Sequence, residues 1–139
     1  MMFPKYSNRH KYNVKQACID AGFELPEVFH KLSNNAITAI WNGIGAEGAW
    51  YNEYIPKRVL GLNIQLPSCP HDIGYQFGTS QKDKVKTDKA FKKNMFIWID
   101  RHSAWRWLAR LRKRIAYGYY LAVKYCGHDA FWKGKRVEK

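Results

Sequence analysis

Cysteines, long apolar runs and repeats are all scarce in this chain of 139 residues. It has three cysteines, and an odd number in a short chain argues against a full disulfide framework. We therefore expect the chain to fold in a reducing compartment, or to be stable without disulfide bonds. The longest apolar run, residues 95–99 (MFIWI), is far too short to span a bilayer.

No classical export signal is visible in the sequence either. Residues 1–14 are polar and basic and contain no apolar stretch of the kind that secretory signals need. These absences predict a soluble chain that is made in the cytoplasm. Because there is no internal repeat or low-complexity linker, and because 46% of the residues are hydrophobic, we expect residues 1–139 to form a single domain.

Acidic residues are few compared with basic ones, since 11 Asp and Glu stand against 24 Lys and Arg. The resulting net charge of +13 implies an anionic partner, because so many cations would otherwise only repel one another. Two partners fit this charge, an anionic phospholipid membrane surface and a nucleic acid. Charge alone does not choose between them.

A helix is predicted at residues 82–101, because this segment has no Gly or Pro and repeats its apolar residues at helical spacing. The apolar stripe contains Phe91, Met95, Trp98 and Ile99, and the opposite side carries Lys82, Lys86, Lys89 and Lys93. Asp88 lies within the stripe, where a carboxylate is unfavourable unless it meets a hydrogen-bond donor. A partner for Asp88 is therefore expected from elsewhere in the fold.

His71 and Tyr75 are the donors that the sequence offers to Asp88. They are four residues apart, so they share one face of a helical segment, and residues 76–80 can return the chain antiparallel. Asp88 could instead pair within its own helix, but such a partner would cover only part of the carboxylate. The candidates for that pairing are Lys84 and Lys92.

A glycine-rich turn lies upstream at residues 42–48 (NGIGAEG) and can direct several backbone carbonyls to one point. Asp72 adjoins His71 but points about 100° away from it around the helix, so it is available for another task. Calcium prefers hard oxygen ligands, often a mixture of carbonyls, carboxylates and water. Asp72 together with the glycine-rich turn would supply that mixture.

Taken together, these motifs resemble the calcium-dependent phospholipase A2 superfamily, in particular small bacterial and prophage-type proteins of this kind. That family has a glycine-rich calcium loop, then His-Asp-x-x-Tyr on one helix, then an aspartate on the antiparallel helix. The resemblance covers about residues 41–99, and the matching residues are Gly43, Gly45, His71, Asp72, Tyr75 and Asp88. It implies an all-α, phospholipase A2-like fold with two antiparallel catalytic helices preceded by a calcium loop.

The reaction that this resemblance implies is hydrolysis of the sn-2 acyl ester of a phospholipid, a step of lipid degradation. His71 would be the general base that activates water, and Asp88 would fix its tautomer and stabilise the imidazolium. Tyr75 would brace Asp88. Direct attack by water also fits the absence of a Gly-x-Ser-x-Gly nucleophile elbow from the sequence.

Calcium is the cofactor that the resemblance implies. The ion would polarise the ester carbonyl and stabilise the oxyanion. Its ligands would be the Asp72 carboxylate and the backbone carbonyls of Trp41, Gly43 and Gly45. The chain departs from the family in two places, because Ser68 stands where a cysteine is usual and the stretch that follows the glycine-rich turn is longer than the family norm.

Residues 101–124 are predicted to form a basic amphipathic helix. Its expected apolar stripe packs against the two catalytic helices and consists of Ala104, Leu108, Leu111, Ile115, Tyr119 and Ala122. The opposite face carries Arg106, Arg110, Lys113 and Lys124. Trp105 and Trp107 stand beside these cations, and this combination suits a lipid interface. A core helix with a solvated basic face is the alternative.

Shorter elements are expected around these motifs. Helices are predicted at residues 12–21, 26–32 and 34–41, and an extended segment at residues 59–66. Ser80 and Asp83 have the spacing of a capping box at the start of the second catalytic helix. The C-terminal helix should end near Gly127, and the aromatic residues after it should fold back.

Two other functions remain open from the sequence. The chain could be a non-enzymatic basic module that binds nucleic acid or an anionic membrane. It could also be a binding domain stabilised by zinc, with two Cys-x-His pairs as ligands, although structural zinc usually has two to four residues between paired ligands. Those pairs are Cys69 with His71 and Cys126 with His128.

Overall fold

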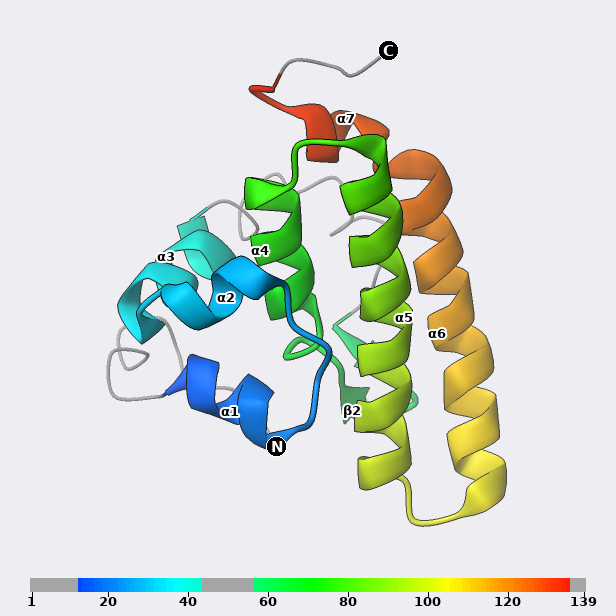
Figure 1. Cartoon of the computed structure of the whole chain (residues 1–139). Helices are drawn as coiled ribbons and strands as arrows, with labels where there is room; N and C mark the ends of the chain where they lie inside the picture. The colour runs from blue at the N-terminus through cyan, green and yellow to red at the C-terminus, as the bar shows by residue number, and fades with distance from the viewer. Residues whose placement is uncertain (1–12, 44–56, 136–139) are drawn as a thin grey trace.

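Residues 13–43 and 57–135 are described by the computed structural model, and this part of the chain is mostly helical (Figure 1). In chain order its elements are α1 (Val14–Asp20), α2 (Glu27–Lys31), α3 (Asn34–Gly43), β1 (Arg58–Val59), β2 (Leu62–Asn63), α4 (Ser68–Phe77), α5 (Gln81–His102), α6 (Arg106–Cys126) and α7 (His128–Trp132). The expected all-α class is confirmed, apart from the two short strands. Within these residues, none of the helices combines the length and the apolar character needed to cross a membrane.

The long helix α5 lies at the centre of the arrangement. A capping box between Ser80 and Asp83 satisfies backbone N–H groups at its start, as predicted, and its 22 residues contain no Gly or Pro. The predicted helix at residues 82–101 is one residue shorter at each end. The predicted stripe is confirmed, because Asp88, Phe91, Met95 and Ile99 are buried.

Helix α4 runs beside α5 and is joined to it by residues 78–80 (Figure 1). It begins at Ser68, three residues before His71. Pro70 is tolerated inside the helix because it lies in the first turn, where a backbone N–H has no partner within the helix. The early start places His71 within a regular helix rather than at its frayed end.

The close approach of α4 and α5 depends on Gly74. A Cβ atom at this position would lie 2.6 Å from Cγ2 of Thr87 on α5. Carbon atoms normally rest about 3.5–4.0 Å apart, so a larger residue at position 74 would push the two helices apart. Since His71 lies one turn before Gly74, the distance from His71 to α5 depends on this glycine as well.

Helix α6 packs mainly on α5, on the side away from α4 (Figure 1). The prediction of one continuous helix at residues 101–124 is wrong at its start, because α5 extends to His102 and α6 begins at Arg106. The predicted apolar stripe is only partly right, because Ile115 and Tyr119 are half-buried against the core, whereas the fully buried side lies about one position, or about 100°, further around the helix. Leu111 is exposed, and the buried residues are Ala109, Arg112, Ala116, Tyr120 and Val123.

Arg112 gives the physical reason for this shift. It is a basic residue on the buried side of α6, and its guanidinium donates to the carbonyl of Leu60 at 2.8 Å and to Ser103 Oγ at 3.0 Å. It also reaches the carbonyl of His102 at 3.3 Å. Arg112 therefore joins α6 to the end of α5 and to the turn between the two strands.

The segment predicted as extended, residues 59–66, contains part of a tight hairpin. Strands β1 and β2 pair antiparallel, with Val59 opposite Leu62. The two residues between them, Leu60 and Gly61, have φ angles of 46° and 84°. Positive φ at both central residues is the conformation of a type I′ hairpin turn. The prediction of extended structure is thus confirmed only in part.

The N-terminal helices pack against α4. Helices α1, α2 and α3 begin and end within two residues of the predicted segments. Phe29 of α2, Ile37 of α3 and Ile73 of α4 are fully buried in one apolar cluster. The segment between α1 and α2 is tied to α5 by Asn94, whose amide accepts from Glu24 N at 2.7 Å and donates to Glu24 O at 2.9 Å.

The C-terminal aromatic residues fold back as predicted. Helix α6 ends at Cys126, and α7 follows directly after Gly127. Phe131 of α7 is fully buried and packs edge-on against Tyr75 of α4, with ring centroids 5.2 Å apart. Helix α7 therefore packs against the ring of Tyr75 through Phe131.

Replacing Asn94 by alanine should lower the free energy of unfolding by about 2 kcal/mol, because two backbone groups of Glu24 lose a buried partner. Urea denaturation should show a lower midpoint with an unchanged m-value. Lys93→Ala is the matched control, since this side chain is 61% exposed and lies 3.7 Å from Glu24. It should change stability by less than about 0.5 kcal/mol. Equal losses in the two variants would contradict the role given to Asn94.

Candidate active site

Asp88 is the centre of a buried hydrogen-bonded group between α4 and α5. Its Oδ1 atom accepts from the Tyr75 hydroxyl at 2.7 Å and lies 3.0 Å from His71 Nε2. His71 and Asp88 are 3% and 2% exposed, and the His71 ring packs against Phe91 with centroids 4.7 Å apart. The prediction that His71 and Tyr75 reach Asp88 from the neighbouring helix is confirmed.

The contact with Asp88 sets the position of the proton on His71. An ionised carboxylate can only accept hydrogen bonds, so Nε2 of His71 is assigned the proton and donates it to Asp88. In the neutral ring, the lone pair is then on Nδ1. That atom lies 4.0 Å from Oδ1 of Asp72. One ring nitrogen is thus committed to Asp88, and the basic one is on the side of Asp72.

Lys84 is a further partner of Asp88. From the sequence we expected it only as an alternative to His71 and Tyr75. Its Nζ atom lies 2.7 Å from Asp88 Oδ2, so the carboxylate has all three partners at once. Lys84 is 2% exposed. The signal that could have found it is its position, because it precedes Asp88 by one turn on the same buried face of α5.

These partners determine the pKa of Asp88. Burial acts to raise this pKa, because a charged carboxylate loses hydration inside a protein. The hydrogen bond and the charge of His71 act in the opposite direction, and Lys84 and Tyr75 add to them. The net effect lowers the pKa of Asp88 below its ordinary value. Asp88 is therefore ionised at neutral pH, as an acceptor for His71 must be.

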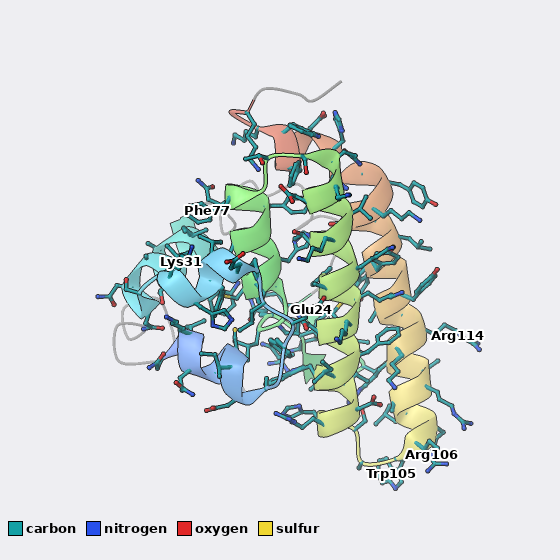
Figure 2. The ribbon with its side chains drawn as sticks, viewed as in Figure 1. Glu24, Lys31, Phe77, Trp105, Arg106 and Arg114 are labelled. Atoms are coloured by element: carbon teal, nitrogen blue, oxygen red, sulfur yellow. The ribbon has the colours of Figure 1, made fainter. Side chains whose placement is uncertain are left out.

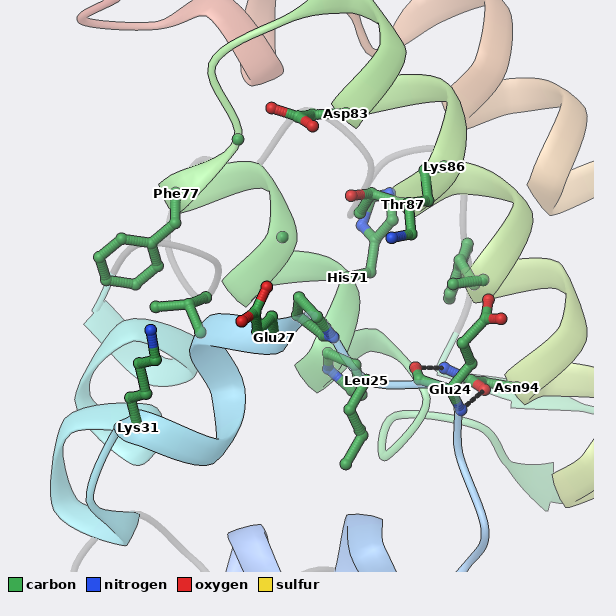
Figure 3. Close-up of a pocket in the computed structure, with 17 residues that line it drawn as sticks. Glu24, Leu25, Glu27, Lys31, His71, Phe77, Asp83, Lys86, Thr87 and Asn94 are labelled. Carbon is green, nitrogen blue, oxygen red and sulfur yellow. Dashed lines mark hydrogen bonds between the residues drawn. The ribbon is translucent and has the colours of Figure 1, made fainter.

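His71 also lines a pocket of about 390 Å³ formed by α4, α5, α2 and the segment before α2. Figure 3 shows Phe77, Glu27 and Lys31 along one side of this pocket, and Thr87 and Lys86 along the side of α5. Apolar groups in its lining include Leu25, Val28 and Phe91. A ligand in the pocket would meet an apolar wall, several charged groups and the imidazole of His71.

The described residues include only some of the candidate calcium ligands. Asp72 is buried in the middle of α4, and Trp41 and Gly43 lie in the last turn of α3, which packs against α4. Nε1 of Trp41 donates to Ser68 Oγ at 3.0 Å and joins this end of α3 to the first turn of α4. Gly45 lies outside the described residues.

The chemistry of these donors fits calcium. Asp72 supplies a carboxylate, and the last turn of α3 presents carbonyl oxygens and the negative end of a helix dipole, which both attract cations. In the part of the chain that the structure describes, no three His, Cys, Asp or Glu side chains cluster in a way that could hold a metal. A calcium site would therefore need backbone carbonyls in addition to Asp72.

The structure does not bring together the four residues of the zinc alternative. Cys126 is exposed at the end of α6, whereas Cys69 is buried next to Cys18 in α1. Burial, and then the hydrogen bond with Cys18, raise the pKa of the Cys69 thiol well above its usual range. Zinc binds the thiolate, so a thiol that keeps its proton is a poor ligand.

The candidate membrane-binding residues lie at the turn between α5 and α6, where Figure 2 labels Trp105 and Arg106, and in the first turns of α6. Trp105 and Trp107 are 60% and 62% exposed, and their rings stack with centroids 6.1 Å apart. Arg106 and Arg110 are exposed, and Lys113 pairs with Asp100 at 2.6 Å. The turn is about 20 Å along α5 from Asp88, so these residues do not surround the pocket.

Comparisons with known proteins identified no relative of this chain. No protein-family model, no curated protein and no solved structure matches this chain.

The lowered pKa of Asp88 predicts that acid weakens the fold through this site. Such a carboxyl adds stability above its unfolded pKa, about 4, and loses it as the pH falls through the lower folded value. Urea denaturation across this acidic range should therefore show a smaller loss of stability in Asp88→Asn than in the wild type. Asp129→Asn, a change at an exposed position on α7, should keep the wild-type slope. An unchanged slope in Asp88→Asn would show that Asp88 does not control acid stability.

Proposed function

We propose that this protein is a calcium-dependent hydrolase of the phospholipase A2 type, which cleaves the sn-2 acyl ester of a phospholipid with an activated water. One observation carries the proposal. The imidazole of His71 is held through Nε2 by the buried carboxylate of Asp88, while the same residue lines a pocket. The order of the motifs along the chain adds support.

Nδ1 of His71 is the atom that takes the proton of the attacking water in this proposal. With the Nε2 proton donated to Asp88, Nδ1 is the acceptor of the neutral ring. Once it gains the proton, the ring is cationic, and the Asp88 carboxylate stabilises that charge across 3.0 Å. Tyr75 binds the same carboxylate oxygen and keeps it in place.

The reaction forms no covalent bond to the protein. The water oxygen bonds to the ester carbonyl carbon as the water proton passes to His71, and the carbonyl oxygen becomes negatively charged. The carbon–oxygen bond to glycerol then breaks as the carbonyl reforms, and His71 gives its proton to the departing oxygen. The products are a fatty acid and a lysophospholipid.

In this proposal, calcium is held by the Asp72 carboxylate and by the backbone carbonyls of Trp41, Gly43 and Gly45. The bound ion would polarise the ester carbonyl and stabilise its negative charge. Asp72 directly follows His71, and its Oδ1 lies 4.0 Å from Nδ1. The carboxylate that would bind the ion is therefore adjacent to the base.

The pocket supports an amphiphilic substrate. Its volume of about 390 Å³ is within the range of small-molecule sites and suits part of a lipid rather than a whole one. Leu25 and Phe91 give it apolar surface for an acyl chain. Lys31 and Lys86 add cations that can attract a phosphate group, beside the carboxylates of Glu24, Glu27 and Asp83 in the same lining.

A membrane surface is the partner that we propose for the turn between α5 and α6. Exposed tryptophans beside arginines suit the boundary between lipid head groups and acyl chains. The residues concerned are Trp105, Arg106, Trp107, Arg110 and Lys113. A nucleic acid bound without catalysis is the second candidate function, and one observation favours it: α6 has no acidic residue and the chain has a net charge of +13.

His71→Gln should reduce calcium-dependent hydrolysis of a fluorogenic phospholipid by about a hundredfold or more, because Gln cannot accept the proton of water. Circular dichroism should show that the helices are retained. His128→Gln is the matched control, since His128 is exposed on α7, and it should keep wild-type turnover. Retained turnover in His71→Gln would rule out the proposed mechanism.

Replacing both Trp105 and Trp107 by alanine should weaken binding to anionic vesicles and slow hydrolysis of vesicle lipid, while hydrolysis of a dispersed short-chain substrate persists. Tyr125→Ala removes another exposed aromatic side chain of α6, 72% exposed, at the far end of that helix, and should have little effect. Vesicle and DNA binding should be compared at the same salt concentration, since both weaken as salt rises. Strong DNA binding with no vesicle binding and no hydrolysis would favour the nucleic-acid module.

A further inference from the structure

Lys84 has an unusual environment for a lysine. Its side chain is almost completely buried, and its Nζ atom has three oxygen neighbours. Asp88 Oδ2 lies at 2.7 Å, the carbonyl oxygen of Val123 at 3.0 Å and that of Lys124 at 3.3 Å. An ammonium group has three protons, so this arrangement uses all of its donors. The charge of Lys84 is therefore compensated without solvent.

The two carbonyl partners come from the last turn of α6. The Val123 carbonyl also accepts from the backbone N–H of Gly127 at 3.0 Å, and a cation at the end of a helix interacts favourably with the helix dipole. Lys84 therefore caps α6 and binds Asp88 with the same group. This links the end of α6 to the carboxylate that holds His71.

Because Lys84 binds one oxygen of Asp88, the two carboxylate oxygens have different partners. Oδ2 is bound by Lys84, and Oδ1 is left to Tyr75 and His71. Because the two oxygens are held by different partners, the carboxylate cannot rotate without breaking a charged hydrogen bond. The oxygen that faces His71 is thus fixed in position.

We propose that Lys84 is a positioning residue of the hydrolytic site, which holds the Asp88 carboxylate in the orientation that keeps the proton of His71 on Nε2. The inference rests on the proposed function, because it concerns the base of that reaction. Sequence reasoning included no such role for Lys84, which reaches substrate only through Asp88 and His71.

The loss of the Lys84 charge would change the hydrogen bond at His71. Without the ammonium, Asp88 loses one of the partners that lower its pKa while burial still raises it, so more of the carboxyl is in the protonated form, which can donate as well as accept. A carboxylic acid that donates to His71 Nε2 requires the ring proton to be on Nδ1. The atom that should accept the proton of water would then already carry one.

Lys84→Met tests this inference, because methionine has a similar length but neither a charge nor a donor. The turnover number should fall by about 10–100-fold, as for other residues that orient a site through a neighbour. KM for a dispersed short-chain phospholipid should stay within about twofold, since Lys84 does not touch the substrate. Lys82→Met, an exposed change on the same helix, is the matched control and should behave as the wild type.

The tautomer of His71 provides a readout that does not depend on hydrolysis. Nitrogen NMR on ¹⁵N-histidine-labelled protein, with the His71 signal assigned through His71→Gln, should show the proton on Nε2 in the wild type. In Lys84→Met it should appear on Nδ1 to a substantial extent. Lys84→Gln keeps a donor for Asp88 without the charge, and it replaces Lys84→Met in both measurements if the methionine variant does not fold.

The two kinds of failure can be distinguished. An unchanged turnover number, or an unchanged His71 tautomer in a folded Lys84 variant, would overturn the role of Lys84 even if the wild type is an active hydrolase. If the wild type hydrolyses no phospholipid, the proposed function fails. In that case the tautomer alone decides whether Lys84 positions the imidazole, supporting that role if it shifts and rejecting it if it does not.

Discussion

A carboxylate buried between helices needs donors on both of its oxygens, and Asp88 obtains them from two helices. His71 and Tyr75 of α4 bind one oxygen, and Lys84 of α5 binds the other. These bonds fix α4 against α5, and the same lysine holds the end of α6 beside them. The contacts that would organise the base are therefore also contacts that hold the fold, so changes at Asp88 should affect stability as well as turnover.

Much of this centre could be predicted from the sequence because it depends on local patterns. The i, i+4 spacing of His71 and Tyr75, and the position of Asp88 in an apolar stripe, are properties of single helices. The capping box at Ser80 is equally local, and it correctly located the turn between α4 and α5. The reaction, the calcium ion and the membrane surface depend on more than these patterns, and they stay predictions.

The features that the sequence did not predict, namely the burial of Lys84 and the buried side of α6, depend on contacts between segments far apart in the chain. A lysine one turn from an aspartate usually forms a solvated pair, and the burial of Lys84 depends on Val123, which is 39 residues away. The stripe of α6 was misplaced because apolar residues such as Leu111 also occur on its exposed side. Arg112, in turn, is buried where carbonyls from two other segments accept hydrogen bonds from its terminal guanidinium nitrogens.

The most direct test of the hydrolytic account follows the oxygen atom of water. A phospholipid with different acyl chains at sn-1 and sn-2, in anionic vesicles, is incubated with the protein in water enriched in heavy oxygen, with calcium or with EDTA. Mass spectrometry then identifies the products. The account predicts that only the sn-2 chain is released, that heavy oxygen enters its carboxyl group and not the lysophospholipid, and that EDTA stops the reaction. Release of the sn-1 chain, label in the lysophospholipid, turnover in EDTA or no fatty acid at all would contradict it.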